Sequence, residues 1–165
     1  LAGADLVITG ENMKLRLQEI LKPMKNDYDL IVLDLPPGLG IITLNALTAS
    51  DCAIIPATAD ILSIKGLDDI HQLVEAVRED SNPSLYIAGV LLTRWNNRSV
   101  VSRDLTEVID EAAGHIGTKV FKAKIREAVA VREAQVMRQN LFQYAPKSGV
   151  ANDYLNFVDE FLGEE

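Results

Sequence analysis

One carboxylate in this 165-residue chain stands at a position suited to ligand binding. Asp34 follows the aliphatic run Leu30–Leu33 and precedes Pro36, Pro37 and Gly38. A continuous apolar run ended by residues that cannot extend it predicts a strand buried on both faces. Open parallel sheets bind ligands beyond the carboxyl ends of their strands, and a carboxylate there can ligate Mg²⁺. For an isolated aspartate, hydrogen bonding to the turn backbone is the simpler role.

The other residues with reactive or aromatic side chains give weaker signals. Cys52 is the single cysteine, which excludes an internal disulfide and a multi-cysteine metal or cluster site. His71 and His115 fall on separate predicted helices and form no metal-ligand pattern. Trp95 follows a predicted strand, where packing is a more common role for an aromatic ring than stacking on a base.

Charge is distributed unevenly along the chain. The net charge is −8, yet residues 94–147 carry 10 basic and 6 acidic side chains. This segment is the place where contact with a phosphate backbone is expected, against the alternative of an ordinary solvated surface. No run approaches the roughly 20 apolar residues of a membrane span, and the first residues resemble no signal peptide. We therefore expect a cytoplasmic protein that does not enter a membrane.

Strand-like apolar runs alternate with amphipathic segments along the chain, which predicts parallel strands joined by helical crossovers. The expected fold is α/β, a parallel sheet with helices on both faces, in a single domain over residues 1–165. The expected strands are 30–33, 52–55, 86–93 and 119–121, and the expected helices are 12–24, 41–48, 63–79, 101–115 and 149–162. The segment 128–138 is expected to be a helix or a turn segment.

Several stretches together resemble the ParA/Soj-type partition ATPase family. YDLIVLDLPPGLGIITLNALTASDCAIIPATAD matches its pattern in order at ten or more positions. GVLLTRWNNRSVVS, KVFKAKIREAVAVREA and YAPKSGVANDYLNFVDEFL resemble later segments of the same family, so the likeness covers nearly the whole chain. The matching positions in the first stretch include Asp34, Pro36, Pro37, Asn45, Ala46, Leu47, Asp51 and Pro56.

The resemblance implies a P-loop NTPase-like fold and roles for particular residues. Asp34 would lie in the magnesium shell, through a water, and Leu35–Gly40 would form a switch loop. Thr93 and Arg94 would begin the nucleotide-base pocket, which the loop Ile125–Val131 would complete. The cofactor-binding residues implied are Asp34, Pro36, Pro37, Gly38, Thr93 and Arg94.

The phosphate-binding loop of that family, KGGxGKT/S, has no match in the chain. A start at Leu1 instead of Met suggests that an upstream portion, with the first strand, was removed. We therefore expect ATP and Mg²⁺ to bind the intact protein, whereas this chain alone binds neither and is catalytically inactive. The alternative is an interaction or regulatory module without a P-loop, which binds a partner or an intact homologue.

The resemblance also implies partners: a second copy in a homodimer, a ParB-like protein, and DNA bound without sequence preference, which would place the intact protein at the nucleoid. Two positions depart from the family pattern, because Lys65 replaces a common glutamate and Arg126-Glu127 replaces a common Pro-Arg pair. The DNA-binding candidates implied are Arg98, Arg103, Lys122, Lys124, Arg126 and Arg132.

Overall fold

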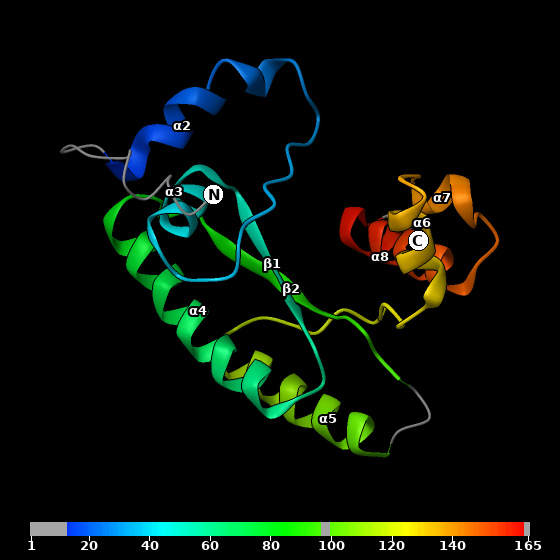
Figure 1. Cartoon of the computed structure of the whole chain (residues 1–165). Helices are drawn as coiled ribbons and strands as arrows, with labels where there is room; N and C mark the ends of the chain where they lie inside the picture. Colours follow the sequence, from blue (N-terminus) through cyan, green and yellow to red (C-terminus); the bar gives the residue numbers. More distant parts are fainter. Residues whose placement is uncertain (1–12, 97–99, 164–165) are drawn as a thin grey trace. The chain divides into compact units, whose positions relative to one another are not determined.

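The computed structural model describes residues 13–96 and 100–163, and for residues 100–103 it describes the backbone alone. Its elements follow one another as a βαβ unit flanked by further helices (Figure 1). They are η1 (Met13–Leu15), α2 (Arg16–Leu21), η2 (Met24–Asn26), α3 (Ile41–Ala49), β1 (Cys52–Ala57), α4 (Ile61–Asp80), β2 (Tyr86–Leu92), α5 (Val100–His115), α6 (Val129–Val136), α7 (Leu141–Tyr144) and α8 (Gly149–Leu162). The chain forms two compact units, one of Ile54–Asp68 with the residues from Ala88 onward, and one of the residues before Ile54 with Asp69–Ile87.

The sheet is parallel and is built around β2. β1 and β2 lie side by side (Figure 1). At their carboxyl ends, the N–H of Thr93, which follows β2, donates to the carbonyl of Ala57, the last residue of β1, at 2.8 Å. The segment 119–126 runs along β2 as well, with parallel bridges from Val90 to Val120 and from Trp95 to Arg126. The predicted parallel sheet of an α/β fold is therefore confirmed.

Helices cover both faces of the sheet within the unit that contains residues 88–163. One apolar cluster joins Val90 and Leu92 of β2 with Leu67 of α4 and Ile109 of α5. Leu91 points the other way, because successive strand residues face opposite sides, and it packs with Phe121, Ile125 and residues of α6, α7 and α8. The predicted placement of helices on both faces is thus confirmed.

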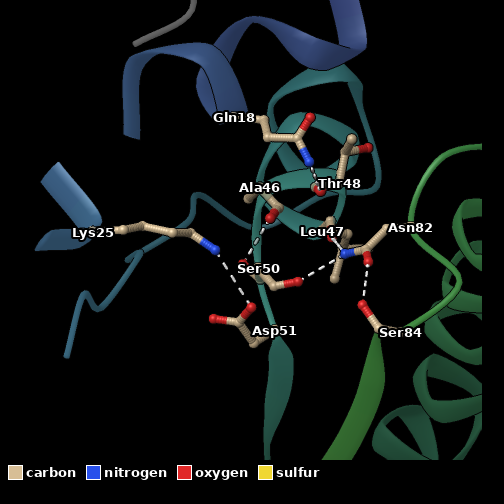
Figure 2. Close-up of polar contacts among 9 residues, drawn as sticks. All are labelled: Gln18, Lys25, Ala46, Leu47, Thr48, Ser50, Asp51, Asn82 and Ser84. Atoms are coloured by element: carbon tan, nitrogen blue, oxygen red, sulfur yellow. Dashed lines mark hydrogen bonds and ion pairs between the residues drawn. The ribbon is translucent and has the colours of Figure 1, made fainter. Parts of the chain in front are cut away.

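In the other unit, α3 packs on the second half of α4. Leu47 of α3 meets Val74 and Val77 of α4, and Leu85 closes the cluster. The carboxyl end of α3 is held by Asn82, whose Nδ2 donates to the carbonyls of Leu47 at 3.0 Å and Ser50 at 2.7 Å; Figure 2 shows this arrangement. The amide thus satisfies carbonyls that a helix end leaves without intrahelical partners.

Replacing Asn82 by aspartate is expected to destabilise this unit more than Asn82→Ala does. Alanine loses the two hydrogen bonds to the carbonyls and the one from Ser84, for a cost of about 1–3 kcal/mol, whereas aspartate sets a carboxylate against two carbonyl oxygens. Chemical denaturation of both variants measures the difference. Ser84→Ala is the control, because its exposed hydroxyl donates only to Asn82 Oδ1 at 3.0 Å. Equal stability of Asn82→Asp and the wild type would contradict the assignment.

The predicted strand at Leu30–Leu33 is wrong. Residues 28–35 form no regular strand, and Leu30 and Val32 are 58% and 79% exposed. A parallel strand is buried on both faces only when neighbouring strands and covering helices surround it. Among the described residues none makes a backbone hydrogen bond to this segment, so its apolar side chains stay exposed.

The predicted helices are confirmed, with small changes in their bounds. The one expected over 12–24 is shorter, since α2 ends at Leu21 and Pro23 precedes the separate turn η2. The strand expected over 119–121 is reduced to the bridge at Val120. α7 was not predicted; Asn140 begins it by accepting a hydrogen bond from the Phe142 N–H at 2.8 Å.

Candidate functional site

The carboxyl ends of β1 and β2 meet the segment 119–126 in one region of the unit that contains residues 88–163. Ile125 N–H donates to the Leu92 carbonyl at 2.8 Å, and Trp95 N–H donates to the Ile125 carbonyl at 3.0 Å. Arg94 and Glu127 form an ion pair, with 3.7 Å between Nη2 and Oε1. The structure therefore brings together Thr93, Arg94 and the start of the Ile125–Val131 loop; that they form two sides of a base pocket stays a prediction.

The three residues that follow β2, Thr93 to Trp95, are held by a left-handed backbone turn, a hydrogen bond and apolar packing. Arg94 adopts a φ of 50°, in the left-handed region that non-glycine residues enter at a cost of about 1–2 kcal/mol. Thr93 is tied to β1, because its hydroxyl donates to the Ala57 carbonyl at 3.2 Å. Trp95 packs on the cluster of Val90 and Leu92, and the Lys124 ammonium lies 4.7 Å from the indole centroid. The packing role expected for Trp95 is confirmed.

The turn after β1 is organised by Asp60. Its Oδ1 accepts the Ser63 N–H at 2.8 Å, its Oδ2 accepts the Thr58 hydroxyl, and the Ser63 hydroxyl accepts the Thr58 N–H at 3.2 Å. The hydrogen bond from Thr58, followed by that from the Ser63 N–H, lowers the pKa of Asp60. Asp60 is therefore ionised at neutral pH and begins α4 with a stable turn.

Two carboxylates of α8 bind the backbone of the segment 122–126. Glu160 accepts the N–H groups of Lys122 and Ala123, both at 2.9 Å. Asp153 accepts Arg126 Nε at 2.6 Å and Nη2 at 2.8 Å, together with the Arg126 N–H at 3.1 Å. Each carboxylate thus satisfies two or more donors of one segment.

The Arg126–Asp153 pair shifts the titration of both groups. Burial acts to raise the pKa of Asp153, but the hydrogen bonds from the Arg126 side chain and N–H outweigh it, so the pKa is lowered. The hydrogen bond to Asp153 raises the pKa of Arg126 in turn. The Asp153 side chain is 9% exposed, whereas that of Arg126 is 56% exposed.

The loop predicted as a switch lies in the other unit. Asp34 is exposed and makes no hydrogen bond or ion pair with another described residue; Pro36 is half-buried and Pro37 exposed. Gly38 has a φ of 132°, which favours glycine, and its carbonyl accepts the Thr43 hydroxyl at 2.6 Å. The loop thus leads into the first turn of α3.

The predicted DNA-binding residues differ in their surroundings. Arg98 lies outside the described residues, and Arg103 lies on α5 with its side chain not described. Lys122 and Arg132 are exposed. Lys124 is engaged with Trp95, and Lys122 and Lys124 share a shallow groove of about 270 Å³ with the acidic Glu107 and Asp110.

Sequence reasoning missed Asp60, Asp153 and Glu160. For Asp60, the spacing of an aspartate three residues before Ser63 at a helix start was an available signal. For the other two, a spacing of seven residues places both on one face of α8. That spacing does not identify the segment they bind, because the partners are 27 and 37 or 38 residues away along the chain.

The residues present fit only part of a site for a magnesium nucleotide. A magnesium ion is usually bound by one or two carboxylates together with phosphate oxygens and waters, and exposed Asp34 can supply one such oxygen. No group of three or more metal-ligating side chains occurs among the described residues. The sequence has no P-loop motif to hold the phosphates.

The parallel sheet covered by helices on both faces, with loops gathered at the carboxyl ends of its strands, is a doubly wound α/β arrangement, and its match to solved structures places it in the P-loop NTPase-like class. A family model described as an AAA domain matches residues 1–87. Sporulation initiation inhibitor protein Soj of Bacillus subtilis is 35% identical over 161 residues, which is 97% of this chain and 62% of the relative. Chromosome partitioning protein ParA of Myxococcus xanthus is 31% identical over 163 residues, 98% of this chain and 56% of the relative.

A solved structure of cobyrinic acid a,c-diamide synthase from Mycobacterium smegmatis matches with a TM-score of 0.80 and 26% identity, over 98% of this chain and 58% of that one. Another structure of that synthase, with bound ADP and magnesium, matches with a TM-score of 0.62 and 30% identity, over 67% of this chain and 45% of that one. The chain belongs to the AAA-domain family whose model matches residues 1–87, and it is similar over nearly its whole length to the ParA and Soj proteins.

The chain spans a little over half the length of these two sequence relatives. Among residues 13–96 and 100–163, no helix is both long enough and apolar enough to cross a membrane.

Proposed function

We propose that this chain is the carboxy-proximal portion of a single ATPase domain that partitions a chromosome, a plasmid or another mobile element. The observation that carries the proposal is the joining of Thr93–Trp95 to Ile125–Glu127 at the strand ends, within a chain 31–35% identical to partition proteins. In this proposal the intact protein acts in the cytoplasm, at the nucleoid. It forms a homodimer with ATP and responds to a ParB-like partner.

Each predicted residue has a role in the proposed protein. Asp34 holds a magnesium shell through a water, and Pro36, Pro37 and Gly38 shape the switch loop that follows it. Thr93 and Arg94 border the nucleotide base. Bound magnesium nucleotide would supply the phosphate chemistry, while these residues orient it and exclude water from the base.

The test of this proposal begins with the DNA upstream of the codon for Leu1. An in-frame KGGxGKT/S motif is expected, and its product should bind ATP with Mg²⁺. Asp34→Asn in that product should weaken magnesium-dependent binding. Asp29→Asn is the matched control, since Asp29 is also exposed on the same segment. Equal magnesium dependence of the two variants would contradict the role of Asp34.

The 165-residue chain by itself is proposed to be inactive. Positioning and electrostatic stabilisation are nearly the whole of phosphoryl-transfer catalysis, and without the phosphate loop both are lost. Calorimetry with ATP and a phosphate-release assay on the purified chain measure this directly. Micromolar affinity accompanied by turnover would overturn the proposal.

We propose non-specific DNA binding by the intact dimer through residues 94–147, with Lys122 and Arg132 as contacts and Arg98 and Arg103 as further candidates. Lys124 and Arg126 are ranked lower, because Trp95 and Asp153 engage them. Lys122→Ala should reduce the slope of log affinity against log salt by about 1. Lys25→Ala, which removes a partner of Asp51, is the control. An unchanged slope for Lys122→Ala would remove that residue from the surface.

A second candidate function is favoured by the exposed apolar segment 28–33. Tyr28, Leu30 and Val32 are 59%, 58% and 79% exposed, and an apolar segment with unpaired backbone groups can pair with another chain. In this alternative the chain is a regulatory module that binds a partner or an intact homologue. Light scattering without nucleotide separates the two: a stable dimer that Val32→Lys converts to a monomer would favour the module.

A further inference from the structure

Helix α8 presents two acidic side chains to one segment of backbone. Asp153 and Glu160 lie seven residues, or about two turns, apart on the same helix. Between them they accept the N–H groups of Lys122, Ala123 and Arg126 and the guanidinium of Arg126. The two carboxylates therefore hold the segment 122–126 at both of its ends.

This segment requires such support because it does not follow β2 regularly. Between the two bridges lie four residues on the side of β2 (91–94) and five on the side of the other segment (121–125). An extra residue on one side leaves part of the ladder unpaired, as in a bulge. The N–H groups of Lys122 and Ala123 face the Glu160 carboxylate, which supplies the acceptors.

Glycine at the start of α8 lets the Arg126 side chain approach the helix. A Cβ added at Gly149 would lie 2.6 Å from Arg126 Nη1 and 2.9 Å from its Cζ. A side chain at this position would therefore displace the guanidinium from its place beside Asp153. The close approach and the bidentate pair fix the same end of the segment.

We propose that α8 positions the start of the Ile125–Val131 loop, which is the candidate base loop. Asp153 and Glu160 hold segment 122–126 against the end of β2 and thereby set the geometry of the site at the strand ends. They are positioning residues, since they act through the loop and contact no ligand themselves. The assignment of this loop to a nucleotide-base pocket rests on the proposed function. The positioning itself is a property of this chain and can be tested without nucleotide.

Trp95 reports the position of the loop. It is the only tryptophan in the chain, and its backbone N–H donates to the Ile125 carbonyl. Its indole ring lies below the Lys124 ammonium, which is 4.7 Å from the ring centroid. Fluorescence of the purified chain therefore senses whether segment 122–126 stays against β2. The variants are Asp153→Asn and Glu160→Gln, with Asp159→Asn as the control, because exposed Asp159 on the same helix has no side-chain partner among the described residues.

The expected result is a red shift of Trp95 emission and a larger acrylamide quenching constant in Asp153→Asn and Glu160→Gln, with far-UV circular dichroism unchanged. Asp159→Asn should match the wild type. Gly149→Ala keeps both carboxylates and should reproduce the red shift by displacing Arg126, which covers the case in which Asp153→Asn does not fold. Wild-type fluorescence in folded Glu160→Gln and Gly149→Ala would overturn the proposal.

ATP titrations of the upstream-extended gene product, wild type and carrying the same substitutions, bear only on the proposed function. If the gene product with a P-loop shows no ATP binding, the base-pocket assignment fails while the Trp95 result stands. If ATP binds and the Trp95 signal is unaffected by all the variants, the positioning role fails alone. The two failures are therefore distinguishable.

Discussion

Replacing Arg126 by alanine is expected to lower the free energy of unfolding by about 2–3 kcal/mol at neutral pH. The guanidinium donates two hydrogen bonds to Asp153, whose side chain is only 9% exposed. Removal of the cation leaves a buried carboxylate whose remaining hydrogen-bond donor among the described residues is the backbone N–H of residue 126. The 56% exposure of Arg126 places the cost below that of a fully buried pair.

The deficit of Arg126→Ala should shrink as the pH falls. In the wild type the pKa of Asp153 is lowered, so its stabilising contribution is present above the unfolded pKa of about 3.9 and is lost as pH falls through the folded pKa. In the variant, burial is no longer offset and raises the pKa of Asp153. Protonation at mildly acidic pH then relieves the buried charge.

Urea denaturation between pH 4 and pH 8 measures this difference. Arg132→Ala is the control, because Arg132 is exposed on α6 and has no ion pair with another described residue. Its stability should stay within about 0.5 kcal/mol of the wild type. A deficit for Arg126→Ala that is the same at pH 4 and pH 8 would show that Asp153 is not the group left unpaired.

Replacing Phe121 by alanine should have the largest effect, about 3–5 kcal/mol, as for other buried phenylalanines. Phe121 is 1% exposed, packs with Leu91, Ile125 and Val150, and meets the Phe157 ring edge-on with centroids 5.1 Å apart. Its loss opens a cavity directly beneath segment 122–126. Thermal and urea unfolding of Phe121→Ala, with Phe142→Ala as a partly exposed phenylalanine for comparison, measure the cost.

Gly89 provides a second, coupled measurement at the same place. A Cβ at Gly89 would lie 2.6 Å from the Phe121 ring, so Gly89→Ala alone should cost about 1–3 kcal/mol through overpacking. In Phe121→Ala the same methyl enters the cavity, and its cost should fall or change sign. Additive effects in the double variant would show that the ring does not occupy this position.

Much of the local structure could be predicted from sequence, because it depends on neighbours along the chain. α8 begins and ends where predicted, at Gly149 and Leu162, since Ser148 caps its start and Gly163 ends it at a φ of 75°. The prediction failed at Leu30–Leu33, where the aliphatic run has the composition of a buried strand. Burial of that run depends on neighbouring strands and helices, which a local pattern does not contain.

Part of the candidate site could likewise be predicted from the sequence, and part could not. The family resemblance implied that Thr93, Arg94 and the loop from Ile125 border one pocket, and the structure places Thr93–Trp95 beside Ile125–Glu127. The acidic residues Asp153 and Glu160 were not predicted. Their charges are plain in the sequence, but their partners are fixed by how α8 packs.

The sequence by itself determined the alternation of strands and helices, the family resemblance and the absence of a P-loop motif from these 165 residues, since each is written in residue order. Only the tertiary structure decided which charges are used. Arg126 is one of several cations in a basic segment, and it pairs with buried Asp153. Glu160 accepts a hydrogen bond from the backbone N–H of Lys122 in the same segment. The reason is physical: hydrogen bonds between groups 27 to 38 residues apart form only where packing brings them within about 3 Å.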